Sequence, residues 1–216
     1  MCGRFALNTT KTEIAKEFKC EHVALGWGKY NIAPSQNITA VIKGDKFNNA
    51  VLMRWGLIPS WVKSLNTWKN SLFSASVETV TEKPSFKDSF KKRPCLIPVS
   101  GFYEWSDIQQ PYYFYTDGSL FALAGIWSSW RNPQVGEQIL SCAILTTVAE
   151  GTISEIHQRM PVIVPREYYD LWLDRVDGRQ SLIESLPKAD LQLHPVSKTV
   201  NSLKNDRAEC IESIAI

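Results

Sequence analysis

The succession of short strand-like runs is the feature of this chain that most limits its fold. Polar or glycine-containing turns separate runs of β-branched, aromatic and aliphatic residues, a pattern typical of β-strands. The strongest runs are ITAVIKG at 38–44, AVLMRWGLIP at 50–59, CLIPVSGFYEW at 95–105, YYFYTDGSLFALAGIW at 112–127 and QILSCAILTTVA at 138–149. We therefore expect a fold built mainly on sheet.

Two turn signals predict antiparallel pairing between neighbouring runs. The polar stretch DKFNN at 45–49 separates the first two runs, which suits a hairpin. Asp117-Gly118 divides the aromatic and aliphatic halves of the fourth run, and Asp-Gly strongly favours a tight hairpin turn. CLIPVSGFYEW and QILSCAILTTVA are each predicted as a single strand.

Helical patterns are fewer. Thr10 and Glu13 have the spacing of a capping box, and apolar residues follow on one helical face, which predicts a helix over residues 10–20. SEIHQRMP at 154–161 predicts a short helix that Pro161 ends. Two more helices are predicted at REYYDLWLD, 166–174, and at GRQSLIESLPK, 178–188, before loop and strand return from Leu191.

These elements predict an α+β fold of mainly antiparallel sheet that closes toward a barrel, with flanking helices. The 216 residues can bury a substantial core, and no repeat, low-complexity stretch or linker divides them. A single domain over 1–216 is therefore expected. Trp55, Trp127 and Trp172 are assigned to its core.

Charge and cysteine usage exclude several classes of protein. The net charge of +2 gives no global signal for nucleic acid. No cysteine pair has CxxC spacing, so neither a zinc site nor a disulfide framework is expected, and we predict no cofactor. No run approaches the roughly 20 apolar residues of a membrane span, and the first residues lack the pattern of a signal peptide. We expect reduced thiols, the cytoplasm and no membrane partner.

One region nevertheless has the composition of a groove for single-stranded nucleic acid. Residues 61–95 hold seven Lys or Arg against three acids, with aromatic residues between them. Cations suit phosphates, and aromatic rings suit unstacked bases. The alternative is a solvated helix face whose apolar side packs into the core.

Cys2 follows the start methionine directly, which raises a chemical possibility. Removal of Met1 would leave a free α-amine beside a thiol. The amine can condense with an aldehyde, and the thiol can then close a thiazolidine ring. Alternatively, Cys2 is an ordinary small residue at a chain end.

Eight short tags together resemble the SRAP family, the SOS-response-associated peptidases, whose better-understood members are abasic-site processing proteins. The tags are MCGRF at 1–5, YNIAPSQ at 30–36, RWGLIPSW at 54–61, SVET at 76–79, CLIPVSGFYEW at 95–105, ALAGIW at 122–127, IHQRMPVIV at 156–164 and HPVSKTVN at 194–201. Each is modest alone, but their order and spacing cover nearly the whole chain.

The resemblance implies a function in the DNA damage (SOS) response. Such proteins recognise abasic sites in single-stranded DNA and form a covalent DNA–protein crosslink, a thiazolidine at the former C1′, through the N-terminal cysteine. The crosslink shields the lesion. The fold implied is a compact α+β domain with a positively charged groove leading to Cys2. We expect a monomer, cytoplasmic and associated with the nucleoid when bound to DNA.

The resemblance also implies catalytic roles for two further residues. Glu104 matches the family's active-site acid, and a carboxylate between two aromatic residues is expected to be partly desolvated, with a raised pKa. We assign Glu104 to the protons of the Cys2 amine. His157 matches the family's histidine and is assigned to protonate the sugar ring oxygen as the aldehyde opens.

Other positions are assigned to DNA binding. Arg4 and Arg159 are the best candidates for holding phosphates, with Lys63 and Lys69 less certain. Trp61 and Pro34 match family positions that wedge or stack against bases beside the lesion. His194 is assigned no chemistry, and four cysteines are assigned to inert packing, namely Cys20, Cys95, Cys142 and Cys210.

The chain departs from the family pattern Asn-Ala-Arg-x-Glu-Thr. It has Ser74 where the pattern has the Asn that helps to hold the catalytic cysteine, and Ser76 where it has an Arg for a DNA phosphate. Serine has a shorter reach than Asn and supplies no cation. We therefore expect weaker DNA affinity and slower or differently tuned crosslinking.

Rival functions are a cysteine peptidase or self-processing protein that uses Cys2, Glu104 and His157, a variant with reduced DNA activity, and a non-catalytic nucleic-acid binding module. A peptidase has no need of a cysteine at the chain end, whereas an aminothiol trap does. A plain structural protein has little support in the sequence.

Overall fold

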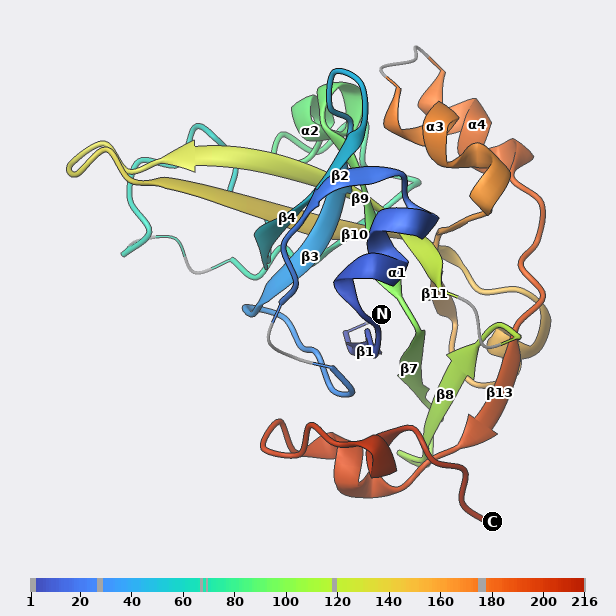
Figure 1. Ribbon diagram of the computed structural model, residues 1–216. Coiled ribbons are helices and arrows are strands. Elements are labelled where there is room, and N and C mark those ends of the chain that lie inside the picture. Colours follow the sequence, from blue (N-terminus) through green and yellow to red (C-terminus); the bar gives the residue numbers. More distant parts are fainter. Residues whose placement is uncertain are drawn as a thin grey trace.

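A computed structural model describes residues 3–26, 29–66, 68, 70–117, 120–174 and 178–215. Over these residues the chain forms two sheets with short helices around them (Figure 1). The α+β class and the mainly antiparallel sheet that closes toward a barrel are confirmed.

The larger sheet contains a closed ring of strands. Strand β9 pairs with β10, β10 with β4, β4 with β3, β3 with β6, and β6 with β9 again. The pairing of β10 with β4 is parallel, and the other four are antiparallel. The ring strands are β3 (Asn37–Ile42), β4 (Asn48–Trp55), β6 (Pro94–Val99), β9 (Phe121–Arg131) and β10 (Gln138–Val148).

Short strands extend this ring. Strand β2 lies beside β4, β5 and β11 lie beside β10, and β12 lies beside β9. The far halves of β9 and β10 project from the body as a long hairpin, yellow in Figure 1. The added strands are β2 (Cys20–Val23), β5 (Ser74–Ser76), β11 (Arg159–Pro161) and β12 (Ile163–Val164).

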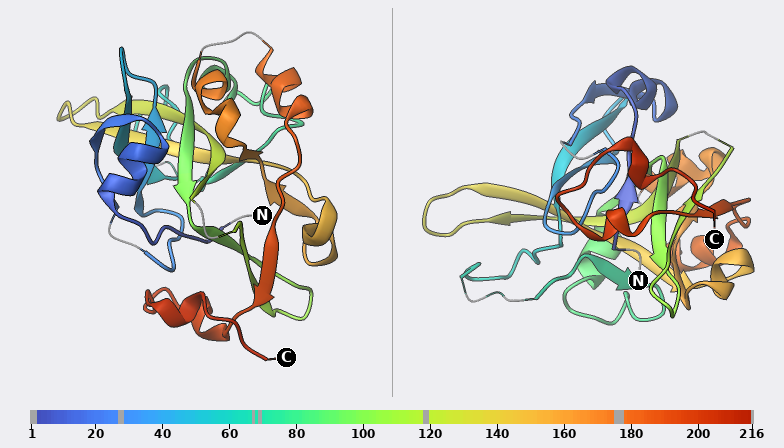
Figure 2. Two further views of the ribbon diagram at one scale, coloured as in Figure 1. Left: turned by 45° about the vertical axis from the view of Figure 1, so that its right-hand side comes forward. Right: turned by 90° about the horizontal axis from the view of Figure 1, so that it is seen from below.

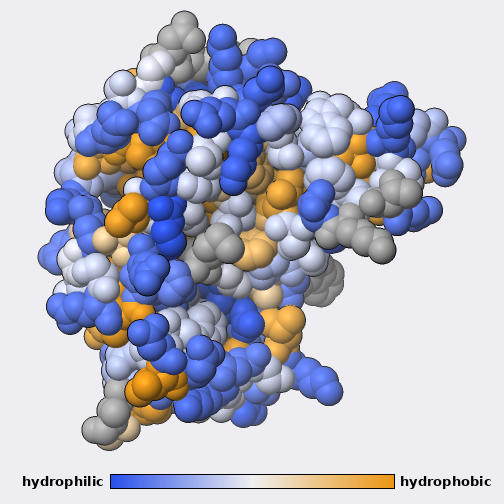
Figure 3. Space-filling view, turned by 180° about the vertical axis from the view of Figure 1, so that it is seen from behind, coloured by the Kyte–Doolittle hydropathy of each residue, from blue (hydrophilic) through white to orange (hydrophobic). Residues whose placement is uncertain are grey.

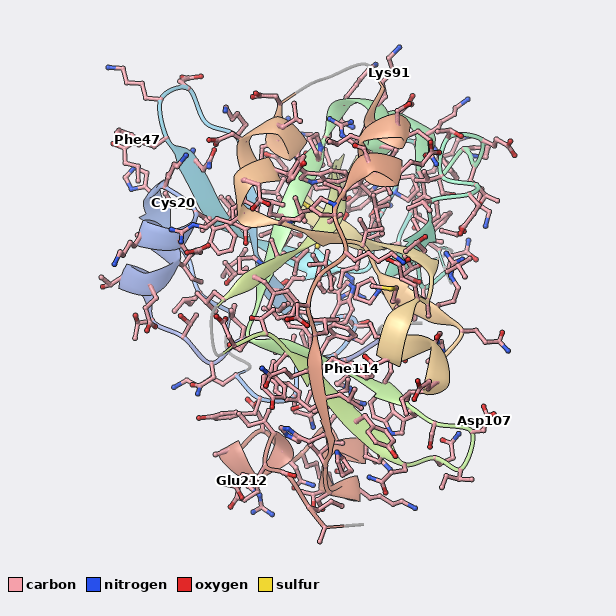
Figure 4. All side chains as sticks on the ribbon, turned by 90° about the vertical axis from the view of Figure 1, so that its right-hand side faces the viewer. Cys20, Phe47, Lys91, Asp107, Phe114 and Glu212 are labelled. Atoms are coloured by element: carbon pink, nitrogen blue, oxygen red, sulfur yellow. The ribbon has the colours of Figure 1, made fainter. Side chains whose placement is uncertain are left out.

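The second sheet is antiparallel, in the order β1-β7-β8-β13, and β13 runs beside β8 in Figure 1 and in the left view of Figure 2. Phe114 of β8 stacks on Phe102 of β7, with 5.2 Å between ring centroids. Figure 4 shows Phe114 near the middle of the molecule and Asp107 at the far tip of the β7–β8 turn. The strands are β1 (Phe5–Ala6), β7 (Gly101–Trp105), β8 (Pro111–Tyr115) and β13 (Gln192–Pro195).

Helices are short and peripheral. The Thr10–Glu13 capping box is confirmed, although α1 ends at Glu17, because Lys19 has a positive φ and the chain enters β2. The predicted helices at 166–174 and 178–188 are confirmed by α3, which follows a 3-10 turn, and by α4. The bounds are α1 (Lys11–Glu17), α2 (Lys87–Lys92), α3 (Tyr169–Leu173), α4 (Arg179–Ser185), and 3-10 turns η1 (Gly151–Glu155), η2 (Arg166–Tyr168), η3 (Lys198–Asn201) and η4 (Ala208–Cys210).

Three local predictions are wrong, although the DKFNN hairpin is confirmed by the pairing of β3 with β4. The Asp117-Gly118 turn does not join a hairpin, because β8 and β9 lie in different sheets; Gly118 itself is outside the described residues. CLIPVSGFYEW forms two strands, β6 and β7, one in each sheet. The helix predicted at 154–161 is instead the 3-10 turn η1 followed by strand β11, in which Pro161 lies.

Gly101 allows β7 to pack closely against β8 directly after β6 has ended. A side chain here would place its Cβ 2.3 Å from the ring of Tyr113 and 2.5 Å from the carbonyl oxygen of Phe114. Only glycine permits this close approach of β7 to β8. The run therefore passes from the barrel into the second sheet without leaving the protein interior.

The core fills the barrel and the space under the helices. Trp55 and Trp172 are fully buried as predicted, whereas Trp127 is only partly buried and packs against the core. The free thiols of Cys20, Cys95, Cys142 and Cys210 are all buried, as predicted. Burial raises the pKa of the Cys20 thiol to about 11, which suits an inert packing role.

The C-terminal segment is tied to the segment before β3 by polar contacts. The buried amide of Asn31 donates to the carbonyls of Val200, Ser202 and Asn205 at 3.1, 3.1 and 2.6 Å. The Asp206 carboxylate accepts from the backbone N–H groups of residues 29–31. The segment after β13 is therefore fixed against the first strands of the chain.

Replacement of Asn31 by alanine tests this attachment. Asn31→Ala leaves buried carbonyl groups without a donor, and we expect a loss of about 2–3 kcal/mol in the free energy of unfolding. Urea unfolding followed by tryptophan fluorescence measures this. Asn66→Ala, at an exposed position, is the control and should change stability by less than about 0.5 kcal/mol. If Asn31→Ala and Asn66→Ala changed the free energy of unfolding equally, the hydrogen bonds of Asn31 would not stabilise the attachment of the C-terminal segment.

Candidate functional site

Glu104 is a buried carboxyl group on β7, an inner strand of the second sheet. Alternation along this strand places it on the same face as Phe102. Only 3% of its surface is exposed, and burial raises its pKa to about 7. The predicted desolvation of this side chain is therefore present, and the group can accept or release a proton near neutrality.

His157 faces Glu104 from the segment between η1 and β11. Its Nε2 atom lies 3.9 Å from Oε2 of Glu104. Its Nδ1 atom lies 3.0 Å from the amide nitrogen and 2.9 Å from the carbonyl oxygen of Arg159. The ring can thus accept from the amide or donate to the carbonyl, so a proton can reside on either nitrogen without a change of ring orientation.

The backbone directs the first residues of the chain toward Glu104. Tyr103 donates its N–H to the carbonyl of Arg4 at 3.0 Å, and β1 pairs Phe5 with Phe102. Continuing this register sets Gly3 opposite Glu104. On the other side, Phe5 bridges Ile32, and the same continuation sets Gly3 opposite Pro34. Cys2, the predicted nucleophile, is bonded to Gly3 but lies outside the described residues, as does Lys69.

Arg4, predicted to hold a phosphate, has partners within the protein. Its Nη1 donates to Oδ1 of Asn31 at 2.6 Å and to the carbonyl of Val200 at 2.7 Å, and its guanidinium lies 5.8 Å from the ring centroid of Trp105. Burial lowers the pKa of Arg4. These contacts join the N-terminal segment to the C-terminal segment.

The side chains of Arg159, on β11, and Ser76, on β5, meet beside β10, with which both strands pair. The guanidinium of Arg159 forms a bidentate ion pair with Glu78 at 2.7 and 2.9 Å and donates to the Thr146 carbonyl at 2.7 Å. Ser76 donates to Glu78 and lies 3.3 Å from Nη2 of Arg159. Ser74 lies two residues earlier on β5, opposite Ile144 of β10.

The remaining predicted DNA-binding residues in the described ranges are at least partly exposed. Trp61 is 53% exposed and meets Trp68 edge to face at 5.6 Å, next to a small apolar cluster around Trp130. Lys63 is exposed on the same segment. Pro34 is partly exposed, before Ser35, which has a positive φ. The structure thus brings together Glu104 with His157 and Ser76 with Arg159.

Two groups in the site have no functional signal in the sequence. Glu78 lies in the SVET tag two residues after Ser76, and Thr146 lies in a run that indicates only a strand. Hydrogen bonding from Arg159 lowers the pKa of Glu78 to about 2. His194, by contrast, contacts the carbonyl of Ile211 at 2.8 Å through Nε2, within the tail.

Other kinds of site have less support. Within the described ranges, no group of three His, Cys, Asp or Glu side chains is arranged to hold a metal ion. None of the helices in those ranges has the length and apolarity to span a bilayer. On the face seen in Figure 3, apolar residues lie in small separate groups among hydrophilic ones.

Sequence comparison identifies relatives along the whole chain. The abasic site processing protein YoqW of Bacillus subtilis (strain 168) is 36% identical over 226 residues, which cover 99% of this chain and 100% of that protein. The abasic site processing protein HMCES of Xenopus tropicalis is 31% identical over 265 residues, which cover 100% of this chain and 79% of that protein.

Solved structures share the fold. A crystal structure of a protein from Bacteroides thetaiotaomicron matches with a TM-score of 0.88 at 22% identity, over 99% of this chain and 100% of that chain. A crystal structure of a protein from Bordetella bronchiseptica matches with a TM-score of 0.78 at 24% identity, over 91% of this chain and 100% of that chain. The model of the family SOS response associated peptidase (SRAP) matches residues 1–203, and the chain therefore belongs to the SRAP family.

Proposed function

We propose that this protein processes abasic sites in single-stranded DNA by forming a covalent crosslink through Cys2 after removal of Met1. The names of the relatives support the choice of lesion. The observation that carries the proposal is a buried, protonatable Glu104 beside His157, at the strand position opposite Gly3. We propose a monomer that acts in the cytoplasm, on the nucleoid, after DNA damage.

The reaction follows from the chemistry of an abasic deoxyribose, which opens to an aldehyde at C1′. The Cys2 amine attacks this carbon, and loss of water gives an imine. The thiolate then adds to the imine carbon, the nitrogen takes up a proton, and a thiazolidine ring closes. The amine and thiol have ordinary pKa values of about 7.7–8.0 and 8.5, so both have reactive fractions near neutrality. Orienting them beside the sugar can lower the barrier by about 7–11 kcal/mol.

Glu104 and His157 divide the proton transfers. Ionised Glu104 takes the proton that the attacking amine must lose, and its raised pKa keeps this exchange possible near pH 7. His157 protonates the sugar ring oxygen as the ring opens, and ionised Glu104, 3.9 Å away, stabilises the protonated imidazole electrostatically. Ser74 supports Cys2 in place of the family's Asn.

Noncovalent contacts hold the DNA strand. Arg4, Arg159, Lys63 and Lys69 supply positive charge, Ser76 offers a hydrogen bond, and Trp61 and Pro34 present surfaces for unstacked bases. Trp61 is 53% exposed, whereas Pro34 is only partly exposed, so Trp61 offers the larger accessible surface to a base. Because bases must be unstacked to meet such surfaces, single strands are favoured over intact duplex.

A cysteine peptidase or self-processing activity is the second candidate. The approach of Glu104 to His157 also suits a base and its orienting carboxylate, with Cys2 as nucleophile. This activity would tolerate residues before Cys2 and would turn over peptides. The crosslinking activity would do neither, so the two are separable in one set of assays.

Mass spectrometry tests the crosslink directly. Met-processed protein, mixed with single-stranded DNA that contains one abasic site, should gain the mass of one strand less one water per protein. Cys2→Ala, and a variant with one extra residue before Cys2, should gain no stable mass because each lacks the 1,2-aminothiol. A wild-type protein without the added mass would show that the proposed chemistry is wrong.

The pH dependence of crosslinking tests Glu104. Its carboxylate form is the active base, so the rate should rise with pH through about 7 in the wild type. Glu104→Gln should slow crosslinking about 100-fold and move the rising limb to the amine's own range, about 7.7–8.0. Glu137→Gln, at an exposed position, should keep the wild-type profile. If the crosslinking rate of Glu104→Gln still rose with pH through about 7, as in the wild type, Glu104 would not be the base.

Restoring the family residues at positions 74 and 76 tests the departure of this chain. Ser74→Asn with Ser76→Arg should raise the crosslinking rate and the affinity for single-stranded DNA, because one change restores an amide and the other adds a cation. Single-turnover kinetics and fluorescence anisotropy measure the two effects. Values equal to the wild type would show that the departure is harmless.

A further inference from the structure

The ion pair of Arg159 with Glu78 occupies most of the guanidinium. Both terminal nitrogens donate to the Glu78 carboxylate, and Nη2 also donates to the Thr146 carbonyl. Bidentate pairs of this kind are the strong form of the arginine–carboxylate interaction. The lowered pKa of Glu78 keeps this carboxylate charged throughout the physiological range. The pair therefore has no net charge.

The two side chains besides Glu78 that share hydrogen bonds with the Arg159 guanidinium are neutral. Ser76 contributes a neutral hydroxyl, and Thr146 contributes a carbonyl and a hydroxyl. The carboxyl group of Glu104 lies beyond, across His157, whose Nδ1 meets the backbone of Arg159. An approaching phosphate therefore meets Glu78 before it gains from Arg159.

We propose that Glu78 is an affinity-determining residue that competes with DNA phosphate for Arg159. In the free protein Glu78 neutralises Arg159, and a bound strand must displace the carboxylate to use this cation. The inference rests on the proposed function, since it assumes that single-stranded DNA reaches this edge of β10. Glu78 thus weakens the hold on undamaged strands.

The geometry gives Glu78 room to be displaced. The side chain is 43% exposed, whereas that of Arg159 is 23% exposed and stays attached through Thr146. Glu78 also borders a cavity of about 490 Å³ that Val148, Met160 and Ile183 help to line. The carboxylate can therefore rotate away while the guanidinium remains in position.

A double-mutant cycle on undamaged single-stranded DNA tests the competition. Glu78→Gln frees one positive charge, so affinity at 50 mM salt should rise about three- to tenfold, and the salt slope should steepen by about 0.7. Arg159→Gln leaves an uncompensated carboxylate and should weaken binding by a similar factor. The double variant replaces a neutral pair by a neutral pair and should bind like the wild type.

Two outcomes would overturn the proposal. One is a double variant that binds as weakly as Arg159→Gln, because Arg159 would then hold phosphate in the presence of Glu78. The other is a gain in Glu78→Gln no larger than in Glu82→Gln, which removes the same charge at a nearby exposed position. The double variant keeps the test informative if Glu78→Gln fails to fold. Because this DNA has no lesion, the result is independent of whether the wild type forms the abasic-site adduct.

Discussion

The burial of one carboxyl group, that of Glu104, is the constraint on which the site depends. Burial favours the protonated form, so the folded protein binds a proton that the unfolded chain has already released between about pH 4.5 and pH 7. The sign is unfavourable to the fold: stability is lost as pH rises across this window. A shift of this size corresponds to about 3 kcal/mol above pH 7, which the barrel core and the attached tail must offset. The protein thus holds a reactive acid at the expense of stability.

The neighbours of the N-terminal segment explain how so short a strand can present a reactive group. Strand β1 has two residues, yet β7 pairs with it on one side and Ile32 bridges it on the other. Arg4 adds a connection to Asn31 and Val200, and Asn31 holds the tail in turn. The two ends of the sequence therefore meet around the site. These contacts hold Arg4 and Phe5 in place, as the proposed function would require of the N-terminal segment.

Sequence patterns within a few residues predict individual helices, strands and turns, but they do not predict which distant strands pair with one another. The capping box of Thr10, the DKFNN hairpin and the core tryptophans Trp55 and Trp172 follow from patterns within a few residues. The Asp117-Gly118 prediction was wrong because β8 pairs with β7 and β13 in one sheet, whereas β9 pairs with β6, β10 and β12 in the other. Likewise, Glu104 and His157 were found from motif resemblance, but no spacing rule indicates that Glu78 would take the guanidinium of Arg159.

Charge distribution links the departure at Ser76 to the way the site would discriminate between strands. A positive groove binds every strand, damaged or not, and its affinity falls steeply with salt. An electroneutral Arg159–Glu78 pair gives up much of this unspecific attraction. The covalent step of the proposed function would need only a brief encounter with an aldehyde. Under the proposed function, a crosslinking protein that binds strands weakly would select the lesion by chemistry rather than by affinity. In that proposal the exposed Trp61 would contact unstacked bases, and the buried Glu104 would take part in the covalent step.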